Sequence, residues 1–400
     1  MMLEAVGNSL AGMAWPLALA LAWLAGEAVS RWLSLPRVCG YALAGFVLAS
    51  GQLGLLPAPA GTPVALLADF AIALVLFELG QHINLNWLRH NRWLAVTSLV
   101  EAFATFIAVL LVARVFGLAP LPALLLAALA MSSSPVAALR VANELRCSGQ
   151  VTERMLHLSA FNCVFAVLVF KAIAAYWVLT SAGGLFPALW HSLVVIGVSA
   201  GIGAMFGVAV PILLRWQQRG AGDATVIFAI ATLLLVSLTH ALQFSALLAA
   251  LVFGLVVRYR RIVFSGADRG FGTLGSLLSI LLFVFASATL SWPQVAQGAG
   301  LALAVLVVRT LCKIGACVSF AGLSGIGWRK GALTGLALTP MSVFAILLLE
   351  QTRHLGIEVF SQVAGLGLLV LVLELLGPVA TQRALILAGE AGREEGRNGA

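Results

Sequence analysis

The residues in this sequence that could do chemistry are polar side chains inside long apolar stretches. Asn162 and Cys163 are neighbours in the middle of MLHLSAFNCVFAVLVFK, residues 155–171, and Lys313 lies deep within LVVRTLCKIGACV, residues 306–318. If these stretches cross a membrane, a lysine at the bilayer centre costs about 2.5–3.5 kcal/mol, so it needs a partner or a function. The plainer alternatives are a small buried cysteine and a lysine that reaches back to the membrane surface.

Two further apolar stretches are interrupted by a proline that is flanked by hydroxyl side chains. A proline removes one backbone donor and clashes with the carbonyl four residues before it, which bends or breaks a helix. The freed carbonyls and nearby hydroxyls can coordinate a cation, and the ends of the half-helices add partial charges. Two such motifs favour a pair of crossed, unwound helices over two simple kinks. The candidate ion-binding and helix-breaking residues are Ser132, Ser133, Ser134 and Pro135 in the first motif and Thr339, Pro340 and Ser342 in the second.

The composition is that of a membrane protein with many spans. Of the 400 residues, 62% are hydrophobic and only 10% are charged, whereas soluble domains carry about 25% charged residues. Too little polar surface would remain to cover so much apolar material in water. The apolar runs are long and continuous, without an alternation of period two, which predicts helices. We therefore expect an all-α polytopic membrane protein.

The apolar stretches predict thirteen transmembrane helices, at about 20 residues for each crossing. With the N-terminus outside and the C-terminus in the cytoplasm, 18 of the 23 basic residues fall in inner loops or at inner span ends. This bias follows the positive-inside rule and indicates the orientation. Two basic residues within spans, Lys171 and Arg309, are expected to reach back to the surface. The predicted spans are approximately residues 12–30, 36–50, 64–83, 93–116, 119–140, 154–179, 187–213, 222–240, 243–257, 271–290, 298–321, 331–351 and 357–380.

Similar features recur seven spans apart. The second and ninth spans are short and place a small residue before a glycine, the third and tenth carry Leu-Phe near their far ends, and the fifth and twelfth are the two interrupted ones. Because seven is odd, each partner crosses the membrane in the opposite direction. Inverted repeats with a broken helix in each half are typical of secondary transporters whose site lies near the midplane.

A secondary transporter needs a group that holds its ion, and a partly buried carboxylate can hold either a proton or a cation. The thiol of Cys163 is a poor ligand for a hard cation, and its pairing as a thiolate with Lys313 is the less favoured alternative. Glu78 and Glu101, in the inner halves of the third and fourth spans, are expected by default to reach back to the surface or to face a loop; the alternative is that one of them acts as a surrogate carboxylate in place of Cys163. The histidines are scattered and the cysteines show no metal-ligand spacing, so we expect no metal, no cofactor and no enzyme. The net charge of +8 is explained by topology, and no nucleic-acid partner is expected.

Several of these motifs together resemble the cation/proton antiporter family, the sodium/proton exchanger domain of bacterial monovalent-cation antiporters. They are PRVCGYALAGFVL, LVLFELG, MSSSPVAALRVANEL, the polar pair of the sixth span, the lysine of the eleventh and ELLGPVATQRAL. The resemblance implies a homodimer in the bacterial inner membrane, in which a core domain moves against a dimerisation domain by an elevator form of alternating access. It assigns residues 1–388 to one transmembrane exchanger domain and 389–400 to a short cytoplasmic tail. The core spans are about 93–179 and 298–380, the dimerisation spans about 12–83 and 222–290, and the linking span about 187–213.

The same resemblance places the ion site in the sixth span, at a polar pair whose second member is an aspartate. The matching residues are Asn162 and Cys163, so the first member is present and the acid is replaced. The expected activity is antiport of protons against sodium or potassium ions. The alternative is a degenerate member of the fold that no longer exchanges these ions and moves another solute or acts as a membrane sensor.

Overall fold

The computed structural model describes residues 2–57, 63–179, 185–217, 221–242, 244–260, 267–289, 292, 299–342, 345, 348 and 364–392. These residues form α-helices joined by short turns, and no β-strand occurs among them. The prediction of an all-α polytopic membrane protein is confirmed.

Each of the thirteen predicted spans coincides with a helix or with a pair of half-helices, and one short helix, α4, was not predicted. Local sequence explains where several helices begin and end. Helices α6 and α7 each begin at a proline, which suits the first turn of a helix. After α5, the turn contains Gly117 with a φ of +80°, a conformation that favours glycine. The helices are α1 (Met2–Leu33), α2 (Arg37–Leu48), α3 (Pro63–His82), α4 (Leu85–His90), α5 (Arg92–Val115), α6 (Pro120–Ala130), α7 (Pro135–Glu144), α8 (Gln150–Leu179), α9 (Leu185–Gln217), α10 (Ala221–Ala241), α11 (Ala246–Tyr259), α12 (Ala267–Ala288), α14 (Ala299–Ser319), α15 (Trp328–Ala337) and α17 (Ala364–Leu387).

The limits of the helices can be compared with those of the predicted spans. Among the described residues, seven helical segments are long and apolar enough to cross a membrane, with α6 and α7 taken together, and four more are apolar but shorter. Helix α1 begins at Met2, and only its part from Met13 onward has the hydropathy of a span. Helix α15 ends at Ala337, and much of the rest of the predicted span 331–351 lies outside the described residues. By length and composition, each predicted span from the first to the eleventh contains an apolar helical segment, and the twelfth and thirteenth extend into residues outside the described ranges.

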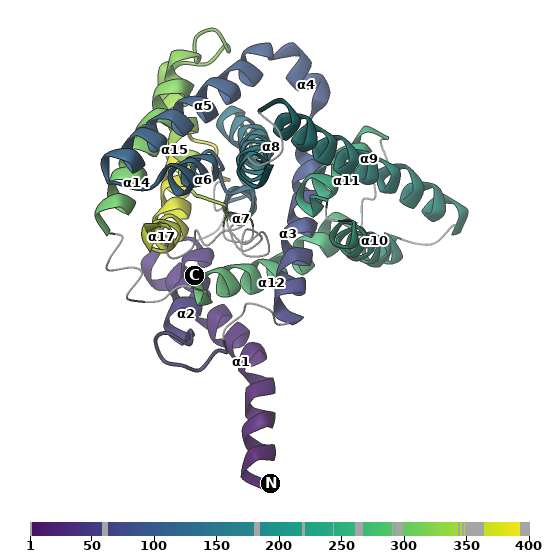
Figure 1. Cartoon of the computed structure of the whole chain (residues 1–400). Helices are drawn as coiled ribbons and strands as arrows, with labels where there is room; N and C mark the ends of the chain where they lie inside the picture. The colour runs from purple at the N-terminus through teal and green to yellow at the C-terminus, as the bar shows by residue number, and fades with distance from the viewer. Residues whose placement is uncertain are drawn as a thin grey trace, which may run out of the picture.

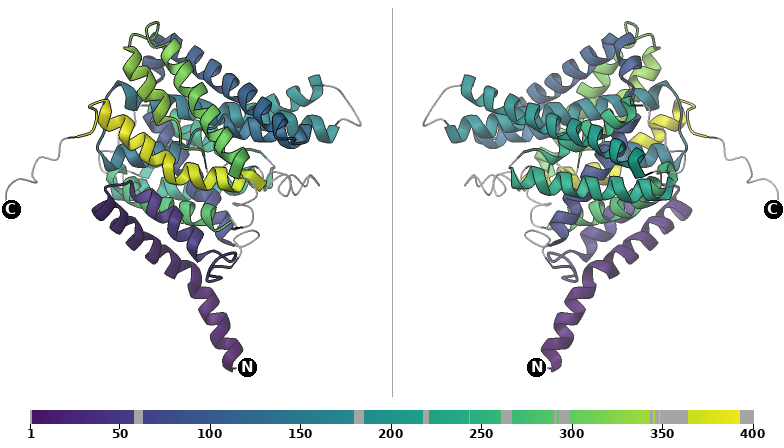
Figure 2. Two further views of the ribbon diagram at one scale, coloured as in Figure 1. Left: turned by 90° about the vertical axis from the view of Figure 1, so that its left-hand side faces the viewer. Right: turned by 90° about the vertical axis from the view of Figure 1, so that its right-hand side faces the viewer.

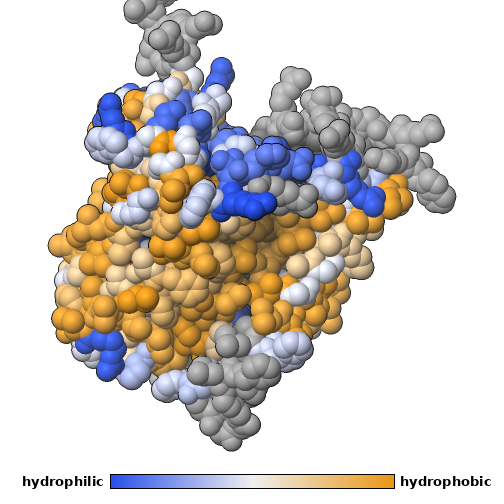
Figure 3. Space-filling model, turned by 90° about the horizontal axis from the view of Figure 1, so that it is seen from above, coloured by the Kyte–Doolittle hydropathy of each residue, from blue (hydrophilic) through white to orange (hydrophobic). Residues whose placement is uncertain are grey.

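The surface matches a lipid environment. Figure 3 shows a broad hydrophobic band across one face, bordered on opposite sides by hydrophilic residues. In water such a continuous apolar surface would cause aggregation, whereas in a bilayer it faces acyl chains of the same polarity. Exposed apolar side chains come from helices throughout the chain and include Leu17, Ile107, Leu111, Leu233, Leu303 and Leu311.

The helices pack in two groups, which Figures 1 and 2 show from three sides. In one group α3 packs against α10, α11 and α12, α9 against α11, and α2 against α1 and α12. In the other, α5 packs against α6 and α14, α8 against α6 and α15, and α14 against α15 and α17. Close backbone contact is built into the first group, since a Cβ on Gly254 of α11 would lie 2.0 Å from the carbonyl oxygen of Phe77 on α3. The groups meet where α8 packs on α9, α17 on α2 and α7 on α3.

The two predicted interruptions are real breaks, and they meet inside the second group. Helix α6 stops before a short extended segment, and α7 restarts at Pro135. The backbone N–H of Ser134 donates to the carbonyl oxygen of Pro340 at 2.8 Å. The hydroxyl of Ser133 donates to the carbonyl oxygen of Leu338 at 3.1 Å. The predicted pair of crossed, discontinuous helices is confirmed.

Candidate ion-binding site

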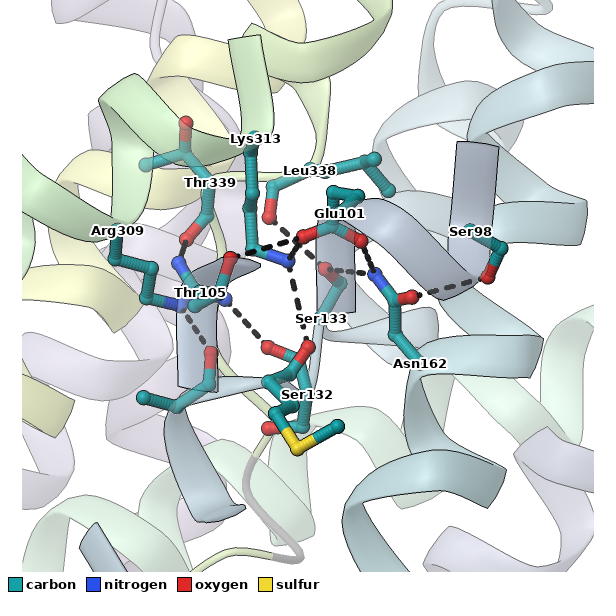
Figure 4. A network of polar contacts seen from close by, with 12 residues as sticks. Ser98, Glu101, Thr105, Ser132, Ser133, Asn162, Arg309, Lys313, Leu338 and Thr339 are labelled. Carbon is teal, nitrogen blue, oxygen red and sulfur yellow. Dashed lines mark hydrogen bonds and ion pairs between the residues drawn. The ribbon is translucent and has the colours of Figure 1, made fainter. Parts of the chain in front are cut away.

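The guanidinium of Arg309, on α14, holds the two breaks together. It is fully buried, and its Nε donates to the carbonyl oxygen of Ala130 at 2.9 Å. Its terminal nitrogens donate to the carbonyl oxygens of Thr339 and Ser132 (Figure 4). One of them also donates to the carbonyl oxygen of Pro340 at 3.3 Å. These four acceptors come from the ends of both broken helices, where backbone carbonyls lack their usual helical donors. The expectation that Arg309 reaches to the membrane surface is therefore wrong.

One turn further along α14, Lys313 pairs with Glu101 of α5. The ammonium bonds Glu101 Oε1, and both side chains are fully buried. The carbonyl oxygen of Met131, in the first break, is 3.4 Å from Lys313 Nζ, and the Thr105 hydroxyl donates to Glu101 Oε1 at 3.4 Å. Burial of either charge alone would be very unfavourable, so each group requires the other at this depth.

Asn162 joins this ion pair to the first break. Its amide nitrogen donates to Glu101 Oε2 at 2.6 Å and to the Ser133 hydroxyl at 3.2 Å. Its amide oxygen accepts from Ser98 at 3.3 Å (Figure 4). Asn162 is fully buried on α8, which packs against α5, α6 and α15. Glu101 thus contacts both Asn162 and Lys313, and Asn162 also contacts Ser133. All four residues are candidates from the sequence, and they form one network.

The other hydroxyl candidates lie at the breaks with different contacts. The Ser134 hydroxyl caps α7, accepting the N–H of the residue three positions later at 3.2 Å. Thr339 reaches Arg309 through its backbone carbonyl, and its hydroxyl donates within its own turn at 2.6 Å. The Ser342 hydroxyl is buried, and no described residue is bonded to it. It is a ligand group available at the second break.

Two candidates have other surroundings. The Cys163 thiol is buried and lies 3.4 Å from the carbonyl oxygen of Ser133, to which it donates a weak hydrogen bond. Glu78, on α3, pairs with Arg140 at 2.6 Å and accepts from Asn143 at 3.4 Å, both on α7. Glu78 therefore belongs to a separate ion pair where α3 meets α7, and Glu101 is the candidate carboxylate that lies at the breaks.

The site gathers oxygen atoms from fully buried side chains and from backbone carbonyls. Carboxylate, amide, hydroxyl and backbone carbonyl oxygens are the ligands that hard cations prefer, and unwound carbonyls serve this purpose in transporters. Within the described ranges, no group of three or more His, Cys, Asp or Glu side chains could hold a metal ion. The arrangement suits a weakly held monovalent cation or a proton that moves between a carboxylate and an amine.

The sequence pattern underestimated two residues. Glu101 lies in the inner half of its predicted span, where contact with a loop was the default expectation, and Arg309 was assigned to the surface. One signal was available: Arg309 precedes Lys313 by four positions, so both side chains lie on one face of α14. A stripe of two basic residues inside a span indicates a protein interior rich in acceptors.

Comparison with known proteins identifies the family and the fold. A family model described as "Sodium/hydrogen exchanger, transmembrane" matches residues 17–382. A structure of the sodium proton antiporter MjNhaP1 from Methanocaldococcus jannaschii at pH 8 superimposes with a TM-score of 0.69 at 15% identity, covering 96% of each chain. A second structure of MjNhaP1, from an electron-microscopy map, gives a TM-score of 0.72 at 17% identity and covers 98% of this chain and all of the other. A search of curated protein sequences finds no match. The chain belongs to the sodium/hydrogen exchanger family of transmembrane proteins.

Proposed function

We propose that this protein exchanges protons for sodium or potassium ions, and that Glu101 is the carboxylate of its ion site. The observation that carries the proposal is the buried pair of Glu101 and Lys313 beside two crossed helix breaks. Asn162 orients the carboxylate through Oε2, while Oε1 faces the lysine. A carboxylate contributed by α5 compensates for the acid that the resemblance leads one to expect at position 163.

Competition between cation and proton follows from charge. In the paired state the Glu101 carboxylate balances the Lys313 ammonium, and the pair is neutral. A sodium or potassium ion that binds Glu101 and neighbouring oxygens repels the ammonium, which then releases its proton to water. When the cation leaves, Lys313 takes up a proton and the ion pair forms again. One proton moves for each cation at this pair, and a buried net charge is avoided in both states.

Alternating access is assigned to movement between the two helix groups. The group that contains α5, α8, α14 and both breaks carries every residue of the network, so it can carry the ion as one body. The group of α1, α2, α3, α10, α11 and α12 would then form the static side and the homodimer contact, and α9 would link the two groups. This is an elevator mechanism in a bacterial inner membrane, with the N-terminus outside and the C-terminus in the cytoplasm.

The assay uses purified protein in proteoliposomes that contain a pH-sensitive dye. With an imposed pH gradient, addition of sodium or potassium chloride should dissipate the gradient, and choline chloride should not. A positive result with either ion identifies the cation. No response to either ion in protein that remains monodisperse would contradict the proposal and favour the alternative, a member of the fold that has lost cation exchange.

Replacement of Cys163 with alanine is expected to leave exchange within about twofold of wild type, because the thiol makes one weak hydrogen bond and does not contact Lys313. The rate of dye dequenching at several sodium concentrations measures this. Cys39→Ala is the matched control, since its buried thiol donates to the carbonyl oxygen of Leu375, outside the network. A tenfold or larger loss in Cys163→Ala alone would assign the site to the thiol.

A further inference from the structure

A second carboxyl group lies in the membrane-spanning part of the protein, outside the network described above. Glu374 is near the middle of α17, is only 2% exposed, and points toward the first helix group. Its Oε2 accepts a hydrogen bond of 2.9 Å from the Ser287 hydroxyl of α12, and Ser287 is fully buried. Its other oxygen, Oε1, has no hydrogen-bond partner among the described residues.

The charged groups on the neighbouring helices form no described ion pair with Glu374. Helix α17 packs against α2, α7, α14 and α15, and Cys39 of α2 donates to the backbone of the residue next to Glu374. No described basic side chain forms an ion pair with Glu374. The titratable or charged residues of these helices are Arg37 (paired with Glu27 and Glu144), Cys39, Tyr41, Arg140 (paired with Glu78), Glu144, Arg309, Cys312, Lys313 (paired with Glu101), Cys317, Arg329 and Lys330.

An ionised carboxylate in such a place is very unfavourable. One hydroxyl donor cannot replace the hydration of a full negative charge, and an unpaired charge in a medium of low polarity becomes neutral by binding a proton. With a proton bound, the group fits its surroundings, because a neutral carboxyl needs few partners and the Ser287 bond can be retained. The contact also joins the two helix groups, so relative movement of α17 and α12 would admit water to it.

We propose that Glu374 and Ser287 form a second proton-binding site, separate from the Glu101–Lys313 pair, whose proton is exchanged with water when α17 and α12 separate. The site takes a proton and no metal ion, since it offers one carboxyl and one hydroxyl. It goes beyond the exchange proposed above by adding a second proton to each transport cycle.

Infrared spectroscopy tests proton binding without requiring transport. In wild-type proteoliposomes near neutral pH, a protonated carboxyl should give a C=O stretching band that shifts in D₂O. The band should be absent in Glu374→Gln and retained in Glu101→Gln. Absence of the band from wild type, or its persistence in Glu374→Gln, would overturn the proposal. If Glu374→Gln is not produced as folded protein, Ser287→Ala replaces it in the test. This variant removes the hydrogen bond to the carboxyl, so the band must move to higher frequency. An unchanged band would refute the assignment.

The transport readout is the cation gradient that just balances an imposed pH gradient at zero membrane voltage. Two protons per cation require about a hundredfold gradient for each pH unit, and one proton requires about tenfold. We expect the balancing gradient to fall from about a hundredfold in wild type to about tenfold in Glu374→Gln. An equal gradient in both proteins would show that the Glu374 proton is not coupled to transport. Since this readout depends on exchange by wild type, failure of the proposed antiport is recognised separately from failure of the second site.

Discussion

Replacement of Glu101 with glutamine is expected to abolish cation-dependent proton movement, with a loss of at least about a hundredfold. Glutamine keeps the size of the side chain and its contact with Asn162 but removes the negative charge that balances Lys313. Removal of one partner from a buried ion pair costs about 3–5 kcal/mol, which equals about two to three and a half powers of ten in an equilibrium constant. The measurement is dye dequenching in proteoliposomes across a range of sodium and potassium concentrations.

Glu78→Gln is the matched control for this experiment. Glu78 is also buried and also paired with a basic residue, Arg140, but it is not in contact with the breaks. The Glu78→Gln variant should retain more exchange activity than Glu101→Gln when both proteins are equally folded. The double variant Glu101→Gln with Lys313→Met should recover thermal stability without recovering exchange, since it removes both buried charges. Normal exchange by Glu101→Gln would contradict the assignment of the ion site.

Replacement of Arg309 with alanine is expected to cause the largest loss of stability. The guanidinium donates to four carbonyl oxygens at the ends of both broken helices, and no described side chain could take its place. Four buried acceptors would lose their donor, and each unsatisfied buried group costs about 1–3 kcal/mol. Thermal unfolding in detergent, followed by size-exclusion chromatography, should show either a large fall in Tm or no folded protein.

Arg114→Ala is the matched control for Arg309. Arg114 also donates to a backbone carbonyl, that of Leu118 at 2.8 Å, but this contact is exposed at the end of α5. Its loss should change Tm by little, because exposed interactions contribute little to stability. The Tm of Arg309→Lys should be close to that of Arg309→Ala. A lysine has a single ammonium group and lacks the planar guanidinium that reaches acceptors on both breaks. A Tm of Arg309→Lys near that of wild type would show that charge alone is sufficient.

Local features of the sequence predicted the scaffold well. Hydropathy and the length of a crossing are properties of neighbouring residues, so almost every helix coincides with a predicted span. The breaks at Pro135 and Pro340 were also predicted, because a proline changes backbone hydrogen bonding wherever it stands in a helix. Helix α1 begins about ten residues before its predicted span, since the limits of helices depend on weak end signals.

The sequence alone was sufficient to predict an all-α membrane protein with two broken helices. It also indicated a functional role for Asn162 and Lys313, because polar and charged side chains at membrane depth carry a cost in free energy. The partners of these two residues are set by the tertiary structure. Glu101 and Lys313 are 212 positions apart, and a single glutamate in the inner half of a span has the same sequence signature whether it faces a loop or the interior. The packing of α5 on α14 and α8 turns its carboxylate toward both residues, and the crossing of the breaks creates the four acceptors that hold Arg309.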